Sequence, residues 1–167
     1  LLNFLFMSIS TAYAYEKKVG IFYDERFLLH DTGPNHPENP ERLIPVIRDL
    51  KNNDRITSNT VWPNFEVATV EELGLAHSKE YIELVDRQVS QLNNNRAYLS
   101  TGDTAISKHT NLVAKLAVGA GLEAVDQIMA GDLTSAFALV RPPGHHASSS
   151  IGMGFCVYNN IAVVSRY

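Results

Sequence analysis

Two adjacent histidines, His145 and His146, are the residues whose type and placement could perform chemistry. They follow the stretch Arg141-Pro142-Pro143-Gly144, in which prolines stiffen the backbone and the glycine allows a close approach of the chain. Two neighbouring imidazoles suit a division of labour, in which one ring accepts a proton and the other tunes it electrostatically. The alternative is a solvated pair or a structural hydrogen-bonding site, and spacing alone leaves both readings open.

Cysteine chemistry is limited by the presence of a single thiol, Cys156. One cysteine forms no internal disulfide, and it excludes zinc sites that need two or more thiolates. Cys156 has no adjacent cation or helix start that would mark it as a nucleophile, so we expect it to pack in the core. The histidine pair also lacks the H-E-x-x-H spacing of a helical zinc pair.

A second segment of interest spans residues 152–160, in which glycines flank a Met-Phe pair. Gly154 would let the backbone pass close to a ligand, and Phe155 would form an apolar wall. A turn that feeds a core aromatic explains the same residues. The pair Asn159-Asn160 is expected to cap the last helix.

The surrounding elements predict an α/β fold. Val19–Tyr23 and the continuous apolar run Ala136–Val140 predict buried strands, the latter covered on both faces of a parallel sheet. Helices are predicted from apolar residues at helical spacing, and they cover about residues 40–50, 78–91, 109–129 and 161–167. Ser78 is expected to cap the second of these helices, and Gly131 is expected to end the third. Because ligands bind beyond the carboxyl ends of strands in open α/β sheets, the histidine loop is expected to carry the site.

The motifs together resemble those of the histone deacetylase and acetylpolyamine amidohydrolase superfamily, in the form of its bacterial and class II members. The matching segments are Arg141–Ala147, Gly154–Cys156, Asn159-Asn160, His36–Leu43, Ala76–Ser78, Tyr81 and Gly102–Thr104. The likeness covers about residues 19–167 and implies an open parallel sheet flanked by helices, of the arginase and deacetylase type, incomplete in this chain.

The resemblance implies roles for the histidine pair. His146 would be the general base that activates a metal-bound water and later protonates the leaving amine, with His145 as its electrostatic partner. The implied cofactor is Zn²⁺, which the family holds with two aspartates and a histidine that follow the Asn-Asn helix. No zinc ligand is therefore assigned in this chain, and we expect the 167 residues alone to lack deacetylase activity.

The resemblance also implies a substrate-binding set. Phe155 would line a narrow tunnel for an acyl-lysine chain, Gly154 would offer a backbone contact, and Asp103 would accept hydrogen bonds at the rim. Arg42 would sit in an inner channel through which the acyl product leaves; its alternative is a surface arginine paired with Glu38 or Glu41. The histidines of the entrance loop, His30 and His36, are not expected to bind a metal.

The implied substrates are acetylated lysine peptides or acetylpolyamines. The runner-up functions are an acetylpolyamine amidohydrolase and a non-catalytic α/β binding module. A serine hydrolase is disfavoured because no G-x-S-x-G elbow occurs. The net charge of −4 does not suggest a nucleic-acid partner.

The first residues predict a partial signal peptide. An apolar run over 1–7 precedes Ala12-Tyr13-Ala14, which has the A-x-A pattern of a cleavage site. The alternative is a buried strand or helix. We expect residues 1–14 to be a signal segment too short for a stable membrane anchor, residues 15–167 to be the N-terminal part of a deacetylase-like domain, and the protein to be exported.

Overall fold

The protein is described by a computed structural model that covers residues 18–93 and 95–167. Its centre is a three-stranded sheet with the order β2-β1-β5, in which β1 spans Val19–Phe22, β2 spans Thr60–Val61 and β5 spans Ser135–Ala138. Both pairs are parallel, and β1 and β5 are in register from Val19 opposite Ser135 to Phe22 opposite Ala138. The predicted open parallel sheet is therefore confirmed.

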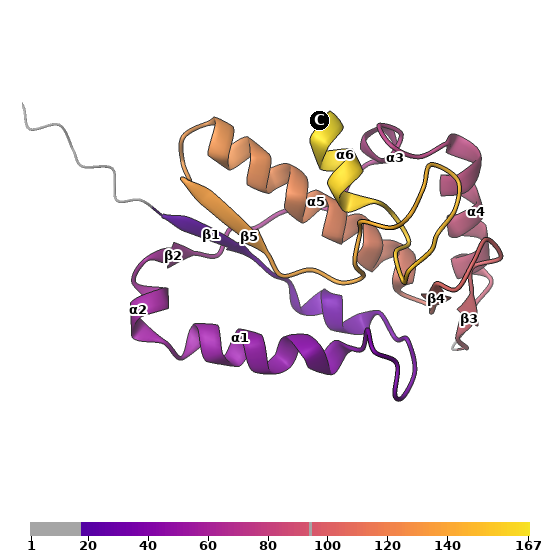
Figure 1. Ribbon diagram of the computed structural model, residues 1–167, viewed down its shortest axis with the longest axis horizontal. Helices are drawn as coiled ribbons and strands as arrows, with labels where there is room; N and C mark the ends of the chain where they lie inside the picture. Colours follow the sequence, from indigo (N-terminus) through magenta and orange to yellow (C-terminus); the bar gives the residue numbers. More distant parts are fainter. Residues whose placement is uncertain (1–17, 94) are drawn as a thin grey trace, which may run out of the picture.

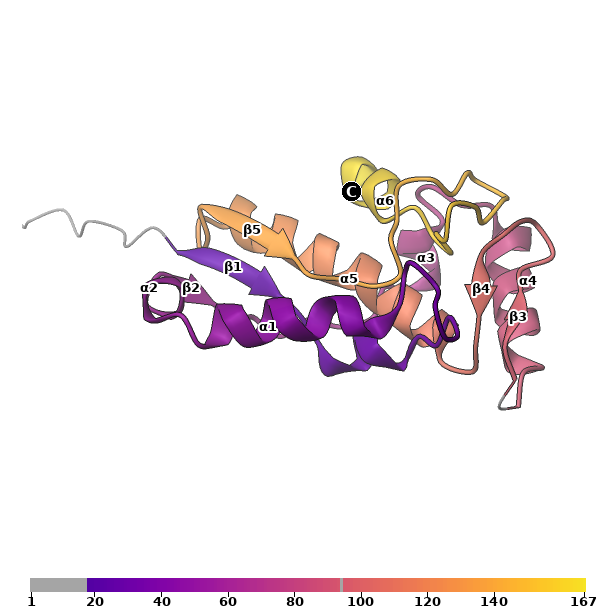
Figure 2. The same cartoon turned by 60° about the horizontal axis from the view of Figure 1, so that its bottom comes forward.

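Helices surround this sheet, and a small hairpin lies apart from it (Figures 1 and 2). The helices are α1 (Leu43–Lys51), α2 (Asp54–Thr57), α3 (Val70–Leu73), α4 (Lys79–Ser90), α5 (Thr110–Met129) and α6 (Asn160–Arg166), with 3₁₀ turns η1 (Glu25–Leu29) and η2 (Pro40–Arg42). The antiparallel hairpin pairs β3 (Ala97–Tyr98) with β4 (Ala105–Ile106).

The two faces of β1 are covered by different helices. Successive side chains of a strand point to opposite faces, and Ile21 accordingly packs with Ile47 of α1 while Phe22 packs with Val113 and Leu116 of α5. Figure 1 shows α1 and α5 on either side of the sheet. The long helix predicted from its stripe of apolar and small residues thus packs against the sheet as expected.

The edge strand β5 corrects one prediction. The apolar run was expected to be covered on both faces, but three of the four residues of β5 are exposed, including Phe137 at 57%. Within the described residues β5 has β1 as its only neighbour in the sheet. An apolar run indicates that a strand is hydrophobic, but it does not indicate whether the strand lies at the centre or at the edge of the sheet.

Local capping signals placed most helix ends correctly. The Ser78 hydroxyl accepts the Tyr81 N–H at the start of α4, and Asn159 Oδ1 accepts the Ala162 N–H at the start of α6. Gly131, with φ of 83°, follows α5 as predicted. The helix expected from residue 40 instead begins as the 3₁₀ turn η2.

Two further predictions concern the periphery of the fold. Val46 is one of the apolar residues at helical spacing in α1, but it is 40% exposed, and α1 buries mainly Ile47. The predicted signal segment, residues 1–14, lies outside the described residues. Within the described part of the chain, no helix has the length and apolarity needed to cross a bilayer.

Candidate active site

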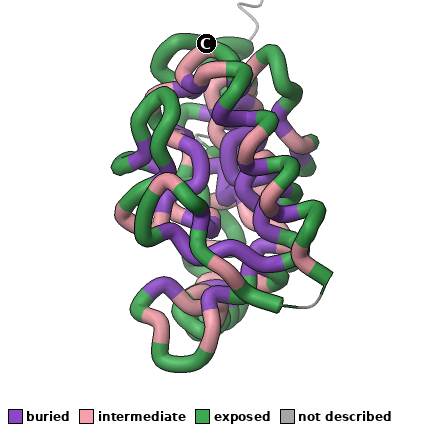
Figure 3. Tube along the Cα trace, turned by 90° about the vertical axis from the view of Figure 1, so that its right-hand side faces the viewer, coloured by how far each residue is buried: buried purple, intermediate pink, exposed green. Residues whose placement is uncertain are grey.

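The histidine loop, residues 141–147, follows the carboxyl end of β5 and precedes α6 in the chain. It lies beside the turn at Gly154 and Phe155, so the two segments with candidate chemistry are brought together. Figure 3 shows how buried stretches of the chain alternate with the exposed loops around them. Within the described part of the chain, the candidate site lies at the surface, and buried residues beneath it hold its loops in place.

The rings of His145 and His146 are close together but exposed. Their centroids are 4.1 Å apart with an interplanar angle of 44°, and neither ring hydrogen-bonds to any residue in 18–93 or 95–167. Both rings are therefore open to solvent within the described part of the chain. His146 abuts Gly154, where an added Cβ would lie 2.7 Å from the imidazole Cδ2, so the ring does stand against the wall that carries Phe155.

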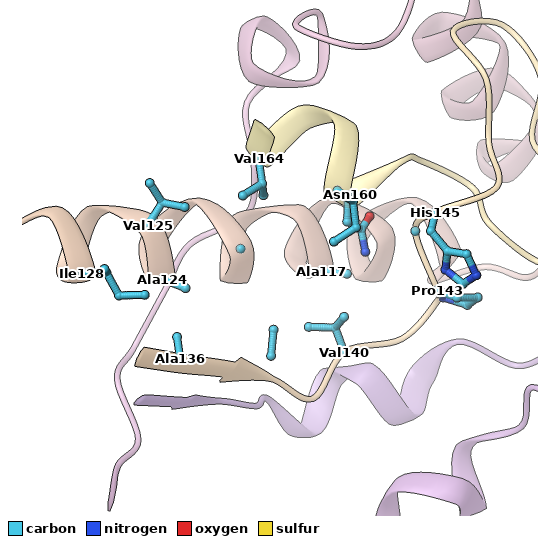
Figure 4. Close-up of a pocket in the computed structure, with 14 residues that line it drawn as sticks. Ala117, Ala124, Val125, Ile128, Ala136, Val140, Pro143, His145, Asn160 and Val164 are labelled. Atoms are coloured by element: carbon cyan, nitrogen blue, oxygen red, sulfur yellow. The ribbon is translucent and has the colours of Figure 1, made fainter. Parts of the chain in front are cut away.

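An apolar hollow of about 430 Å³ opens on the other side of the pair. It lies between α5, β5 and α6, and His145 stands with Pro143 at one end of it (Figure 4). Its walls are mainly small aliphatic groups such as Ala117, Ala124 and Ala136. Apart from His145, no ionisable side chain of the described residues lines it, so the hollow is no catalytic centre by itself.

The turn from Met153 to Cys156 presents Phe155. Gly154 and Phe155 both have positive φ, at 57° and 67°, and the Cys156 N–H donates to the Met153 carbonyl. A positive φ is unfavourable for a residue with a large side chain. Asp103 supports the turn, because its Oδ1 accepts the Gly154 N–H at 2.9 Å.

Phe155 is also held from the opposite side. The ring of His36 meets it edge-on, with centroids 4.7 Å apart. Phe155 thus lies between His36 and the histidine loop. Asp103 is exposed, and sequence analysis did not foresee that it fixes this turn.

A buried ion pair anchors the start of the histidine loop. The Arg141 Nε and Nη2 donate to the two carboxylate oxygens of Glu38 at 2.6 and 3.0 Å, and the two side chains are 2% and 3% exposed. Arg141 also donates to the carbonyls of Phe27 and Glu38. Sequence analysis placed both residues in motifs without pairing them, because 103 positions separate them.

His30, at the start of the entrance loop (residues 30–40), belongs to this buried cluster. It is 1% exposed, its Nδ1 is 2.9 Å from the Thr110 hydroxyl, and its Nε2 is 3.7 Å from Glu38 Oε2. Burial, reinforced by the charge of Arg141, lowers the pKa of His30 to about 3. His30 is therefore neutral, and its contact with Glu38 is no ion pair.

Arg42 takes the position of the surface alternative. Its side chain is 59% exposed, and its Nη1 lies 3.8 Å from Glu38 Oε1. Across the described ranges, no three histidine, cysteine, aspartate or glutamate side chains are grouped to hold a metal ion.

The end of the histidine loop is fixed by α6. Asn159 Nδ2 donates to the Ala147 carbonyl at 2.7 Å, and the Ile161 N–H donates to the Gly144 carbonyl at 3.1 Å. Gly144 is packed against the side chain of Asn160, which a Cβ at position 144 would overlap. The glycine before the histidines is thus explained by a close approach of the loop to a helix.

Cys156 lies in the core beneath the histidine loop. It is fully buried, its Sγ accepts the His145 N–H at 3.4 Å, and the thiol donates to the Gly154 carbonyl at 3.4 Å. The prediction that it packs rather than reacts agrees with this placement.

Comparisons with known proteins agree on one protein family. Residues 36–167 match the family described as the histone deacetylase domain. The chain is 35% identical over 166 residues to Histone deacetylase 5 of Arabidopsis thaliana, 35% over 156 residues to an uncharacterized protein of Synechocystis sp., and 37% over 143 residues to Polyamine deacetylase HDAC10 of Homo sapiens.

These matches cover most of this chain and a smaller share of the relatives. They cover 91%, 89% and 84% of this chain, but 24%, 48% and 21% of those three proteins. The crystal structure of the HDA15 HD domain matches with a TM-score of 0.81 at 33% identity, over 89% of this chain and 42% of that one. The chain thus spans less than half the length of each of these proteins.

Proposed function

The chain belongs to the histone deacetylase family, and from that membership we propose that it forms part of an amidohydrolase that removes acetyl groups from acetylated amines. The observation that carries this proposal is the arrangement of His145 and His146. They stand on an anchored loop after the carboxyl end of a parallel strand, with His146 against the turn that presents Phe155.

The chemistry requires two proton transfers. Hydrolysis of an amide needs a base that takes a proton from the attacking water and an acid that delivers a proton to the departing nitrogen. A neutral imidazole can do the first and the resulting imidazolium the second, so we assign both steps to His146. His145, whose ring centroid is 4.1 Å from that of His146, is assigned as its electrostatic partner.

We propose in addition that the activity depends on Zn²⁺, which in hydrolases acts as a Lewis acid on the carbonyl and the water. A catalytic zinc needs three protein ligands. The described residues do not fit this requirement, because no three suitable side chains are grouped among them. The ligands would come from a longer chain, and the 167 residues by themselves are expected to be inactive.

For the substrate we propose an acetylated lysine side chain or a chemically similar acetylated amine. Phe155 would contact its aliphatic part and the Gly154 backbone would flank it. Asp103 uses Oδ1 for the turn, and no described residue donates to its Oδ2, which leaves that oxygen for an N–H of the substrate. An acetylpolyamine is the second candidate, because its cationic amines would be attracted by the same carboxylate.

The test compares this chain with a longer one that carries the rest of the domain, on an acetyl-lysine peptide and on an acetylated polyamine. We expect turnover by the longer chain alone, and a loss of about 10² to 10⁴-fold in His146→Ala, the range of general acid–base catalysis. His109→Ala is the matched control, because His109 is an exposed histidine at the start of α5.

The outcomes separate the parts of the proposal. Full activity of His146→Ala in the longer chain would exclude its acid–base role. Turnover by the 167-residue chain that a chelator abolishes would contradict the expectation that this chain lacks the zinc ligands. Failure of the longer chain on both substrates would favour a non-catalytic binding module.

We also propose that the protein is exported, on the basis of the apolar start and the A-x-A pattern at residues 12–14. The N-terminus of the longer chain, through residue 20, fused to a reporter that is active only after export should give a processed, active reporter. Replacing both Ala12 and Ala14 by phenylalanine should block processing. An unprocessed cytosolic fusion would refute this.

A further inference from the structure

The histidine loop has no regular secondary structure, yet its position is defined by hydrogen bonds. The side chains of His145 and His146 contribute none within the described residues, so backbone anchors must orient them. Arg141 anchors the start of the loop. The anchors at its far end converge on two residues that the proposed chemistry does not use, His77 and Ser78.

His77 fixes the position of Asn159, and Asn159 in turn fixes the histidine loop. Its Nε2 accepts the Asn159 N–H at 2.9 Å, and Asn159 Nδ2 donates to the carbonyl of Ala147 at 2.7 Å. Ala147 directly follows His146 and is 3% exposed. Two hydrogen bonds therefore connect a buried imidazole to the peptide unit next to the proposed acid–base residue.

The same two residues contact the loop at a second point. The Ser78 N–H donates to the Ser149 carbonyl at 2.9 Å. His77 Nδ1 lies by the backbone of Ser148 and Ser149 without a partner in hydrogen-bonding geometry among the described residues. The His77-Ser78 pair thus contacts both the segment just after Ala147 and Asn159, the N-cap of α6.

The chemistry of the contact selects a neutral imidazole. Because Nε2 accepts a hydrogen bond it carries no proton, so the single proton of the ring lies on Nδ1. His77 is 4% exposed, and burial lowers its pKa, which favours this neutral form. The ring packs between Tyr81 and Tyr158, each with its centroid 5.3 Å away, so it has little freedom to turn.

We propose that His77 is a positioning residue for His146, acting through Asn159 and the Ala147 carbonyl. An aromatic ring of similar size would fill the same space but would leave the Asn159 N–H without an acceptor. The inference deepens the proposed function and rests on it for its catalytic meaning. The structural part, the coupling of position 77 to the histidine loop, stands on the hydrogen bonds alone.

The first experiment uses the 167-residue chain and needs no activity. In His77→Phe we expect hydrogen exchange of the Asn159 amide to accelerate at least tenfold and the His146 ring signal in NMR to shift or broaden. In His77→Gln, whose amide oxygen can accept the Asn159 N–H, both should return toward the unsubstituted chain. Val85→Ala is the matched control, because Val85 is fully buried in the cluster that also contains Tyr81 and Tyr158.

Two results would overturn the proposal: unchanged Asn159 exchange and His146 signals in His77→Phe, or equal changes in Val85→Ala. Should His77→Phe fail to fold, His77→Gln and Asn159→Ala decide. His77→Gln should then preserve the His146 signal, and Asn159→Ala should disturb it.

The second experiment measures kinetics in the longer, zinc-loaded chain. His77→Phe should lower kcat at least tenfold with little change in KM, and His77→Gln should recover part of the loss. Equal kcat in His77→Phe and the unsubstituted enzyme would overturn the catalytic meaning. If the unsubstituted longer chain is inactive, the proposed function fails while the exchange data still test the coupling.

Discussion

Replacing Arg141 by methionine should be among the most damaging single changes in this chain. Methionine keeps much of the side-chain length but removes the cation that is 2% exposed and bound to both oxygens of Glu38. The Glu38 carboxylate, itself 3% exposed, would then be buried with Arg42 as its nearest cation, 3.8 Å away and largely in solvent. The Phe27 carbonyl would lose its donor as well.

The magnitude follows from this burial. Removing one partner of a buried ion pair costs about 3–5 kcal/mol, because the other charge stays desolvated without compensation. Total stabilities of domains are about 5–15 kcal/mol, so the variant should lose a large share of its free energy of unfolding. The double variant Glu38→Leu with Arg141→Met should lose less than the sum of the single variants, since it leaves no buried charge.

The assay is urea unfolding of the 167-residue chain, followed by circular dichroism, with the slope m compared between variants. The matched control is Arg26→Met. Arg26 makes the same two-point contact with Asp24, at 2.9 and 2.8 Å, but its side chain is 42% exposed, so its loss should be below about 1 kcal/mol. Similar losses in Arg141→Met and Arg26→Met would refute the reasoning.

Three further predictions concern the same region. Burial lowers the pKa of His30 from about 6.5 in the unfolded chain to about 3 in the folded one, so between these values only the unfolded chain binds the extra proton. Stability should therefore be fully present above pH 6.5 and fall by about 1.4 kcal/mol per pH unit from there down to about pH 3, and His30→Asn should reduce this slope in urea unfolding. An unchanged slope would contradict a buried neutral His30. Asn159→Ala should lose about 1–2 kcal/mol in urea unfolding, because it removes the cap of α6 and the bond to the histidine loop; a loss below about 0.3 kcal/mol would argue against both contacts. Gly154→Ala should move the His146 signal in NMR, whereas Gly131→Ala, also at positive φ but with no atom within 4 Å, should lose stability without moving it; equal shifts would refute the steric argument.

Features with local causes could be predicted from the sequence. The caps at Ser78 and Asn159 and the stop at Gly131 depend on a few neighbouring residues, and the structure confirms all three. The two strands and the long helix follow from hydrophobic periodicity. The proximity of the histidine pair to the Gly154 turn could be expected from the resemblance alone, because hydrophobic periodicity does not indicate which separate segments come into contact.

Features with distant causes could not be predicted in this way. The Arg141–Glu38 pair joins positions 103 residues apart, and the His77–Asn159 bond joins positions 82 residues apart. Each partner alone looks like an ordinary polar residue in a loop or before a helix. Their importance appears only after folding has buried them, because burial is what makes an unpaired polar group costly.

The glycine before the histidine pair has a mechanical consequence. Gly144 and the Asn160 side chain are in direct contact, and the Gly144 carbonyl accepts the Ile161 N–H, so the loop and the first turn of α6 are joined at two points. Val164 of α6 packs closely against Gly121 of α5. A shift of α6 along α5 is therefore expected to displace the two imidazoles as well.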